Sequence, residues 1–492
     1  TKSIISGAEE IIRQRGAGEQ WAIDKSEQAS GNGYESEETS VVNVVSVVNR
    51  NTSSLHAKAT FVVSVVREAP EDLEPEALYG LAGDVVRAIK PSTESHPAAL
   101  LASFIAEVGC MMGRGPHVYR DGARHACNEF VNLVGLSGVS RKGTASRRVQ
   151  EVTTAAGAQP PLCHGLGSGE ALVAALVPDD EDNLFAERRL LVKEEEFSRA
   201  LKVMRRDGST LSENLRSAWD AGILASVTKG KKMEVRDAHV SLLGHITEAE
   251  LRAELSAVSM FNGFANRFLW FCVRRVGSLP FGGGDVHSAP LVSRLHQTME
   301  FSAKAGRMEF DDETRALWDR EENGGGGIYD LLTARPPGLL GAVTSRAEAH
   351  VTRLSLMWAL LDLEREIRVP HLMAALAVWD FCERSCAYLF GSSTGDEYAD
   401  RIYELLVDAG SGYVTRQEIH GHFQRNAPAG KVDHALNLLE RLGRAERTKL
   451  DATKGRAAEA WSANQFTIND RNDSNDGSPL ARAREIIAKG TK

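Results

Sequence analysis

Residues 131–150 read VNLVGLSGVSRKGTASRRVQ, and they predict a short buried strand, a glycine-containing loop and the start of a helix. The apolar residues at 131–134 are interrupted only by one Asn, as in a strand covered on both faces. Gly135 and Gly138 follow and permit a tight turn. The polar stretch after the loop indicates the first turns of a helix. A strand that leads through such a loop into a helix is typical of an α/β fold.

The loop is a variant of the phosphate-binding spelling G-x-x-x-x-G-K-[S/T]. Arg141 stands where the second Gly should be, and Gly143 separates Lys142 from Thr144. A bound phosphate needs inward N–H groups, a helix N-terminus and a cation. We therefore expect Lys142 to contact the phosphates of ATP and Thr144 to hold Mg²⁺, the alternative being an ordinary strand-to-helix turn. The predicted nucleotide-binding residues are Gly135, Gly138, Arg141, Lys142, Gly143 and Thr144.

Composition restricts the class of protein. The chain has 492 residues, 42% of them hydrophobic and 25% charged, as in an average globular protein. Its net charge of −9 argues against a histone-like coat for nucleic acid but leaves room for local basic patches. No apolar run approaches the roughly 18 residues that cross a bilayer, and no signal peptide is visible. We expect a cytoplasmic protein without membrane contact. The six Cys, including Cys382 and Cys386, are expected to be packed thiols rather than zinc ligands.

The first 74 residues are predicted to be a linker and a docking segment. Residues 24–40 are polar, acidic and rich in Gly and Ser, which indicates disorder. Valine pairs follow at 41–48, and FVVSVV at 61–66 repeats the pattern. β-Branched residues favour a strand, whereas their near-three spacing favours a helix, and both alternatives stay open.

Residues 75–288 are predicted to form the α/β core. Helical patterns precede the opening loop, and strands alternate with helices after it, which implies a parallel sheet with crossover helices. Residues 289–395 are predicted to be a helical extension. Residues 396–468 show three helices and a basic hairpin, the outline of a winged helix-turn-helix domain, and residues 469–492 begin as a solvated tail.

Acidic residues follow the strand that begins near Arg189. A nucleotide-hydrolysing site needs a carboxylate at the end of a strand near the loop, to hold Mg²⁺ or position the attacking water. Glu194 and Glu196 are the candidates, with Glu194 also a metal ligand. As a lone feature, the same cluster would be a solvated helix start.

Two further polar residues flank apolar strands. His245 ends the run HVSLLGHIT, where it either senses the γ-phosphate or hydrogen-bonds to backbone. Arg267 precedes an aromatic strand in NGFANRFLWF. It either reaches a neighbouring subunit as an arginine finger or is a structural arginine paired with an acid at the edge of the sheet.

Basic residues mark candidate DNA contacts. Lys202, Arg205 and Arg206 precede a small-residue loop, and KGKK at 229–232 is a second exposed loop. Both are alternatively plain solvated surface. In the predicted winged helix, Ala435, Leu436, Leu438 and Leu439 should pack inward, while four polar residues of the same helix should point outward. The DNA contacts predicted there are Lys431, Arg441, Arg447 and Lys449, although winged helices also dock proteins.

Five segments carry a resemblance that spans roughly residues 77–395. They are GLSGVSRKGTA, GLGSGEAL, LLVKEEEFSRALKVMRRDGSTLSENLRSAWD, HVSLLGHIT and NGFANRFLW. In this order they resemble a family of P-loop proteins of unknown function from bacterial, plasmid and phage replication regions, often beside or fused to primase-polymerase genes. The RKGT spelling of the loop resembles the family's own. Lys193 and Glu195 depart from its apolar-then-Pro wording, which leaves the identity of the catalytic acid open.

The resemblance implies a RecA-like P-loop NTPase core with helical additions, similar to hexameric DnaB-type motors. It implies ATP and Mg²⁺ as cofactors, and Glu170 as a further catalytic candidate. The expected function is an ATP-dependent motor on DNA, most simply single-stranded, in replication of a mobile element. The expected partners are five further copies of the chain in a hexamer and a primase-polymerase. The alternatives are a non-hydrolysing scaffold that binds nucleotide or DNA and an ATPase of phage defence.

Overall fold

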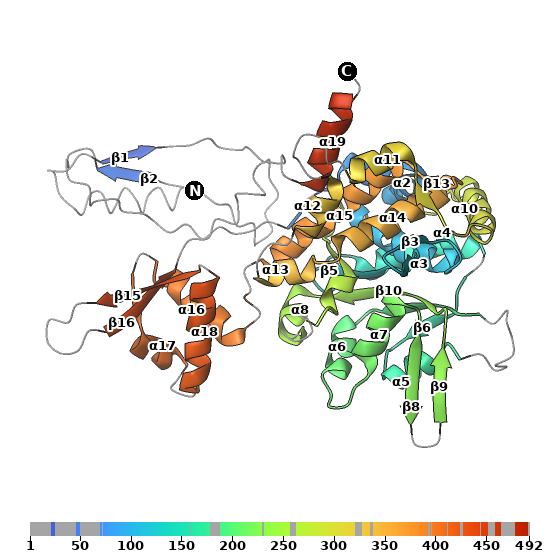
Figure 1. Cartoon of the computed structure of the whole chain (residues 1–492). Coiled ribbons are helices and arrows are strands. Elements are labelled where there is room, and N and C mark those ends of the chain that lie inside the picture. The colour runs from blue at the N-terminus through green and yellow to red at the C-terminus, as the bar shows by residue number, and fades with distance from the viewer. Residues whose placement is uncertain are drawn as a thin grey trace. The chain divides into compact units, whose positions relative to one another are not determined.

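The chain divides into two compact units, residues 69–395 with 468–492 and residues 1–68 with 396–467. Each is described separately (Figure 1). The computed structural model describes residues 21–24, 46–49, 69–70, 72–157, 159–177, 187–228, 231–255, 262–319, 327–334, 338–391, 394, 396–410, 412–423, 427–442, 444–450, 458–463 and 478–490.

The valine-rich N-terminal segment contains a strand. β2 (Ser46–Asn49) pairs antiparallel with β1 (Trp21–Asp24), so the strand alternative is confirmed for residues 46–48. The rest of the predicted linker, residues 41–45 and the second valine segment at 61–66 lie outside the described residues.

A five-stranded parallel sheet forms the centre of the larger unit, in the order β11-β5-β10-β7-β6. Three of these strands are buried along their whole length, because helices cover both faces of the sheet. The predicted parallel α/β sheet is confirmed, and it is compatible with a Rossmann or RecA-like core. The strands are β5 (Phe130–Val134), β6 (Leu162–His164), β7 (Arg189–Glu194), β10 (His239–Ile246) and β11 (Phe268–Cys272).

The crossover helices lie on opposite faces of this sheet. The connection from β5 runs to the far edge strand β6, and the chain then returns through β7 to β10, so right-handed crossovers place their helices on different sides. α4 packs with α3 in one apolar cluster, whereas α5, α6 and α7 pack in the other (Figure 1). These helices are α3 (Pro97–Met112), α4 (Lys142–Ala155), α5 (Gly169–Ala174), α6 (Phe197–Met204) and α7 (Leu211–Asp220).

The reversal of direction makes the carboxyl ends of β5 and β10 a topological switch point. β5 and β10 are neighbours, yet α4 after β5 and α8 (Glu248–Glu254) after β10 pack on opposite faces. In open α/β sheets a crevice forms outside the strand ends at such a point, and ligands bind there. The loop at 135–141 therefore occupies the position in this fold that is best suited to a ligand.

Five of the helices between residues 289 and 390, namely α10, α11, α12, α14 and α15, contribute to the same core as α2 (Gly80–Ile89), α3 and α4, whereas α13 packs in the other apolar cluster. α14 and α15 are buried nearly all round, which is possible only inside a shared core. The boundary predicted at 288 therefore does not separate two compact units. Two short strands, β12 (Glu309–Phe310) and β13 (Glu366–Ile367), also pair within the segment predicted to be helical. Its helices are α10 (Ala289–Ser302), α11 (Asp312–Trp318), α12 (Ile328–Thr333), α13 (Gly338–Val343), α14 (Ala347–Leu361) and α15 (Val369–Phe390).

Two hairpins that the sequence patterns did not predict lie outside the main sheet. β3 (Val118–Arg120) pairs with β4 (Ala123–His125). β8 (Leu224–Thr228) pairs with β9 (Lys231–Val235), so Lys231 and Lys232 of the KGKK segment belong to a strand, while residues 229–230 lie outside the described residues.

The smaller unit contains three helices and a three-stranded antiparallel sheet in the order β14-β16-β15. One apolar cluster holds it together, with Trp461 of the sheet packed among residues of all three helices. The predicted order of helix, short strand, two helices and hairpin is confirmed. The elements are α16 (Glu397–Asp408), β14 (Val414–Thr415), α17 (Arg416–His422), α18 (Ala429–Arg441), β15 (Ala445–Leu450) and β16 (Ala458–Ala463).

The C-terminal residues depart from the predicted solvated tail. Residues Pro479–Gly490 form α19, which packs against α12 and α15 of the larger unit. Leu480, Ala483 and Ile486 are buried there, and Arg484 pairs with Glu74 and Glu76 at 2.8 and 2.6 Å. The prediction was wrong because the acidic residues before 478 hide an amphipathic pattern that begins only after them.

Candidate functional site

The loop between β5 and α4 begins at Gly135, whose backbone is pressed against the segment after β11. A Cβ atom at residue 135 would lie 2.3 Å from the carbonyl oxygen of Val273, so only glycine fits. Gly138 adopts the left-handed region at φ +68°, which glycine permits without strain. Leu136 and Val139 point their side chains into solvent. Both predicted glycines are therefore required by the backbone of the loop.

Arg141 ends the loop in the conformation that a glycine normally supplies. Its backbone has φ +58° and ψ +26°, although it carries a long side chain. The left-handed region costs an L-residue about 1–2 kcal/mol. The side chain is anchored, because Arg141 Nε donates to Glu94 Oε2 at 2.7 Å. The Arg in the place of the second Gly thus keeps the backbone turn that the phosphate-loop spelling encodes.

Lys142 is the first residue of α4, and its ammonium turns back over the loop. Nζ donates to the carbonyl oxygen of Gly135 at 2.5 Å, to Ser140 Oγ at 3.1 Å and, more weakly, to the carbonyl oxygen of Leu136 at 3.4 Å. All three partners are neutral oxygens. Burial lowers the pKa of Lys142 to about 8, and the carboxylate of Glu250 counteracts this in part. An anion that binds next to this half-buried ammonium would stabilise its charged form.

Gly143 and Thr144 complete the first turn of α4. The first N–H groups of a helix have no partner within it, and they lie at the positive end of the helix dipole. The first intrahelical bond at this end runs from Ala145 N to the carbonyl oxygen of Arg141 at 3.0 Å. The N–H groups of the turn and the ammonium of Lys142 thus belong to one end of one helix, which is the arrangement expected of a phosphate site.

His245 lies on β10, the strand next to β5. It pairs with Leu133, one residue before the end of β5. Burial, and after it the positive charge of Lys142, lowers the pKa of His245 to about 3, so its imidazole is neutral. Among the described residues no hydrogen-bond partner reaches its Nε2. Of the two alternatives, a bond to backbone through Nε2 is therefore not made, and His245 stays a candidate sensor of a bound phosphate.

Lys193, which departs from the family wording, makes a buried ion pair under α4. Its Nζ lies 2.6 Å from Glu107 Oε1 of α3 and donates to Gln150 Oε1 of α4 at 3.2 Å. Thr153 donates to the other carboxylate oxygen of Glu107 at 2.6 Å. Removing one member of a buried pair commonly costs about 3–5 kcal/mol. Lys193 therefore fastens β7 to the two helices beneath the loop.

Glu194 is buried at the carboxyl end of β7, whereas Glu195 and Glu196 are exposed. Burial raises the pKa of Glu194, and the N–H of Leu166, which donates to its Oε1, counteracts this. Glu194 pairs with Gly244 of β10, which in turn pairs with Asn132 of β5. With strands about 4.8 Å apart, its backbone lies roughly 10 Å from that of β5.

Glu170 is not brought to the loop. It lies in the first turn of α5, after the edge strand β6, and β6 is three strands away from β5. Its carboxylate accepts a hydrogen bond from Thr210 Oγ1 at 3.3 Å. The strand spacing places it roughly 14 Å to the side of the loop. Glu194 is therefore the better-placed acid.

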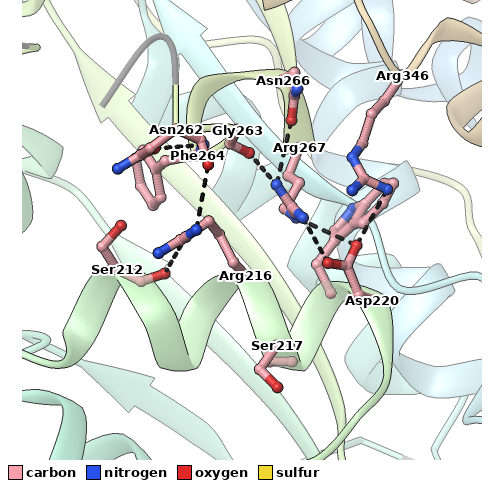
Figure 2. Close-up of polar contacts among 12 residues, drawn as sticks. Ser212, Arg216, Ser217, Asp220, Asn262, Gly263, Phe264, Asn266, Arg267 and Arg346 are labelled. Atoms are coloured by element: carbon pink, nitrogen blue, oxygen red, sulfur yellow. Dashed lines mark hydrogen bonds and ion pairs between the residues drawn. The ribbon is translucent and has the colours of Figure 1, made fainter. Parts of the chain in front are cut away.

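Arg267 makes an ion pair within its own chain, and its role as an arginine finger toward a neighbouring subunit stays a prediction. Figure 2 shows its guanidinium facing Asp220 at the end of α7, with Nη2 2.5 Å from Oδ2. It also donates to the carbonyl oxygen of Gly263, and its side chain is 8% exposed. Arg346 holds the other oxygen of Asp220 at 3.3 Å.

The position of Arg267 in the sheet explains this outcome. Arg267 directly precedes β11, and Phe268 pairs with Phe130, the first residue of β5. It therefore lies at the amino edge of a parallel sheet, roughly 13 Å from the edge that carries the loop. The alternative, an arginine paired with an acid of its own chain, is confirmed.

The candidate DNA contacts are exposed but partly paired. Lys202 and Arg205 lie 3.6 and 3.1 Å from Glu254 of α8, and Arg206 is exposed beside them. On α18, Ala435, Leu436 and Leu439 are buried as predicted, and Leu438 is half-buried. The outward residues of α18 are Lys431, His434, Asn437 and Arg441. On the hairpin, Arg447 pairs with Glu459 and Lys449 is exposed.

Sequence reasoning missed Glu94 and Arg275. Glu94 Oε1 accepts from Arg275 Nη2 and from the N–H of Leu279, both at 2.7 Å, while its other oxygen holds Arg141. The N–H of Leu279 is the main cause that lowers the pKa of Glu94, so this carboxyl group is ionised. No motif marks Glu94, because its partners lie 47 to 185 residues away along the chain.

No protein-family model matches this chain, and no curated protein matches its sequence. Within the described residues, no helix is long and apolar enough to cross a membrane. The same residues contain no group of three or more His, Cys, Asp and Glu side chains arranged to hold a metal ion. The fold and the loop geometry together define the larger unit as an α/β protein with a candidate anion site at the switch point of its sheet.

Proposed function

We propose that the loop from Gly135 to Thr144 binds the phosphates of a nucleoside triphosphate, with ATP as the expected ligand. The ammonium of Lys142 carries this proposal, because it is half-buried at the switch point of the sheet and has neutral oxygens as hydrogen-bond partners. The first turn of α4 adds N–H groups at the same end. An anion that displaces the carbonyl oxygens of the loop would contact both the ammonium of Lys142 and the N–H groups of the first turn of α4.

We further propose that the site takes Mg²⁺ and hydrolyses ATP. Mg²⁺ keeps several waters and uses one or two protein oxygens together with substrate phosphates, so a closed set of protein ligands is not required. The hydroxyl of Thr144 and the carboxylate of Glu194 are suitable donors. The backbones of β5 and β7 lie roughly 10 Å apart with β10 between them, so a phosphate at the loop and a hydrated ion near Glu194 would lie side by side beyond the strand ends. Mg²⁺ would neutralise charge on the phosphates, while Glu194 would hold the ion or orient water.

The expected biological role is an ATP-dependent motor on DNA that acts in replication of a mobile element. The resemblance to replication-region P-loop proteins supports this role, as it supports a hexamer and a primase-polymerase partner. The smaller unit supports it independently, because its order of helices and strands is compatible with the expected winged helix and its α18 exposes Lys431 and Arg441. Phosphate contacts from such side chains would hold the unit on nucleic acid.

A second candidate is a scaffold that binds nucleotide without turnover. The buried Glu194 favours it, because its carboxylate already accepts a hydrogen bond from Leu166. Arg267 favours it too, since its guanidinium is already paired with Asp220 of the same chain. An ATPase of phage defence would use the same parts as the motor.

ATP binding and ATP hydrolysis, measured with and without single-stranded DNA, test these candidates. Hydrolysis stimulated by DNA supports the motor. Binding without turnover in folded protein supports the scaffold. Hydrolysis that DNA leaves unchanged supports an ATPase of another kind, and absence of ATP binding contradicts the proposal.

A further inference from the structure

Phe281 is a fully exposed aromatic residue on a tight turn. The turn comprises Leu279 to Gly282, and Gly282 N donates to the carbonyl oxygen of Leu279 at 3.0 Å. Gly282 and Gly284 both adopt left-handed φ values, +78° and +75°. The turn thus holds the ring out from the surface. Burying an apolar ring removes it from water, so binding of a flat apolar partner to this exposed ring is favourable.

The turn is fastened on both sides of Phe281. Before it, Leu279 N donates to Glu94 Oε1 at 2.7 Å. After it, Arg148 of α4 donates to the carbonyl oxygen of Gly284 at 3.1 Å. Gly283 is packed so closely that a Cβ there would lie 2.2 Å from Cα of Ser92. The ring is therefore presented by a fixed turn, which lowers the entropy lost when it meets a ligand.

The segment that leads to Phe281 runs along the candidate phosphate loop. Val273 N donates to the carbonyl oxygen of Val134 at 2.8 Å, where the loop begins. Six residues later Leu279 is joined through Glu94 to Arg141, where the loop ends. Phe281 follows two residues after this second contact, and two residues span at most about 7 Å. The ring is thus tethered beside the end of the loop at which Lys142 begins α4.

We propose that Phe281 stacks against the base of the nucleoside triphosphate whose phosphates the loop binds. This inference rests on the proposed nucleotide site. A base is the flat, apolar part of a ligand whose charged part belongs at Lys142, and every base offers a π-face to an aromatic ring. Stacking is tolerant of base identity, so Phe281 would position the ligand without selecting ATP over other nucleotides.

Binding of ATP and of inorganic tripolyphosphate to the full-length chain tests the inference, since only ATP has a base. Stacking of a base on an aromatic side chain is worth about 1–3 kcal/mol, which is about 5- to 140-fold in affinity at 1.4 kcal/mol per tenfold change. Phe281→Ala should weaken ATP binding by a factor in this range and leave tripolyphosphate binding unchanged. Phe281→Trp should keep ATP affinity, with quenching of its fluorescence by ATP and not by tripolyphosphate. Tyr119→Ala is the control, because Tyr119 is another exposed aromatic residue of the same unit.

The outcomes separate this inference from the function on which it rests. If the wild type binds both ligands, Lys142→Ala binds neither and Phe281→Ala binds both unchanged, the phosphate site stands and the stacking role is overturned. If the wild type binds neither ligand, the proposed nucleotide site fails and the stacking role with it. If Phe281→Ala alters self-association while both affinities stay unchanged, the ring contacts protein, which also overturns the inference.

Discussion

The ammonium of Lys142 donates a hydrogen bond to the carbonyl oxygen of Gly135, seven residues earlier, and so joins the start of α4 to the end of β5. The loop between them is closed on itself. A phosphate that binds there must replace carbonyl oxygens as the partner of the ammonium, and charge-assisted bonds to phosphate are roughly twice as strong as neutral ones. Substitution of Lys142 is therefore a direct test of whether the loop binds phosphate.

Lys142→Ala should abolish binding of ATP and of tripolyphosphate, because no other lysine among the described residues donates to the loop carbonyls. Truncating one partner of a buried, hydrogen-bonded charge pair commonly costs about 2–5 kcal/mol of binding free energy, which is about 30- to 4,000-fold in affinity. The unfolding midpoint should stay close to that of the wild type, since neutral partners lose little when the amine is removed. Isothermal titration and thermal unfolding measure the two effects. Lys202→Ala, at an exposed lysine, is the control. Unchanged affinity in Lys142→Ala would mean that the loop is only a turn.

Affinity for tripolyphosphate should depend on pH through the same amine. Burial lowers the pKa of Lys142 to about 8 in the free protein. Below pH 8 the ammonium is already charged, so binding takes up no proton there. Above pH 8 the amine is neutral and binding must also take up a proton, so affinity should fall by up to about tenfold per pH unit. Titrations at pH 7, 8, 9 and 9.5 measure the slope. Lys142→Arg keeps its charge and should give a flat profile, and an equal slope in both proteins would assign the titration to another group.

Arg141 should tolerate glycine better than valine, because its backbone is left-handed. Arg141→Gly removes a strain of about 1–2 kcal/mol but adds backbone freedom in the unfolded chain and loses the Glu94 ion pair. We expect a change within about 1 kcal/mol in the free energy of unfolding, with ligand binding retained. Arg141→Val loses the same ion pair and keeps the strain, so it should be less stable than Arg141→Gly by about 1–2 kcal/mol. Urea unfolding of the two variants decides this, and equal stabilities would refute the argument from backbone strain.

The parallel sheet was predictable because several of its strands are short, mostly apolar runs between helical patterns. Runs such as residues 130–134 and 268–272 can be recognised as strands without tertiary information, and the loop glycines and Lys142 can be recognised in the same way. The predicted exposed face of α18 followed from helical periodicity in the same way. These features depend on neighbours within a few residues of the chain, where spacing alone fixes which side chains share a face.

What the sequence could not provide was the set of long-range partners. Asp220 holds Arg267 from 47 residues away, and Glu107 holds Lys193 from 86 residues away. One available signal was overlooked, since Arg267 precedes its strand whereas the loop follows its own strand. In a parallel sheet these positions lie at opposite edges, so Arg267 does not lie beside the loop of its own chain. The PFGGG sequence around Phe281 was a second overlooked signal, because an aromatic residue followed by glycines indicates an exposed turn.

Arg267→Ala should lower stability rather than impair chemistry. It removes a nearly buried guanidinium and leaves Asp220, which is 36% exposed, with Arg346 as its ion-pair partner. We expect a loss of about 2–4 kcal/mol in the free energy of unfolding, somewhat below the range for fully buried pairs. Arg346→Ala removes a more exposed partner of the same carboxylate and should cost about 1 kcal/mol or less. If Arg267→Ala is as stable as the wild type and loses only ATP hydrolysis, this result would support the role of Arg267 as an arginine finger.

Glu194→Gln should separate ATP binding from ATP turnover. Glu194 ends β7 at the edge of the sheet that carries the loop, whereas Glu196 is exposed and Glu170 lies three strands from β5. The amide oxygen of Gln can still accept the hydrogen bond from Leu166, so the fold and ATP affinity should persist. The charge that would hold Mg²⁺ or orient water is lost, and hydrolysis should fall by about 100-fold or more.

Glu196→Gln and Glu170→Gln are matched controls that should keep wild-type turnover. Single-turnover assays with ATP and Mg²⁺ measure the three rates. Normal turnover in Glu194→Gln with loss in one of the other two would move the catalytic acid to that residue, and wild-type protein that binds ATP without any turnover would favour the scaffold.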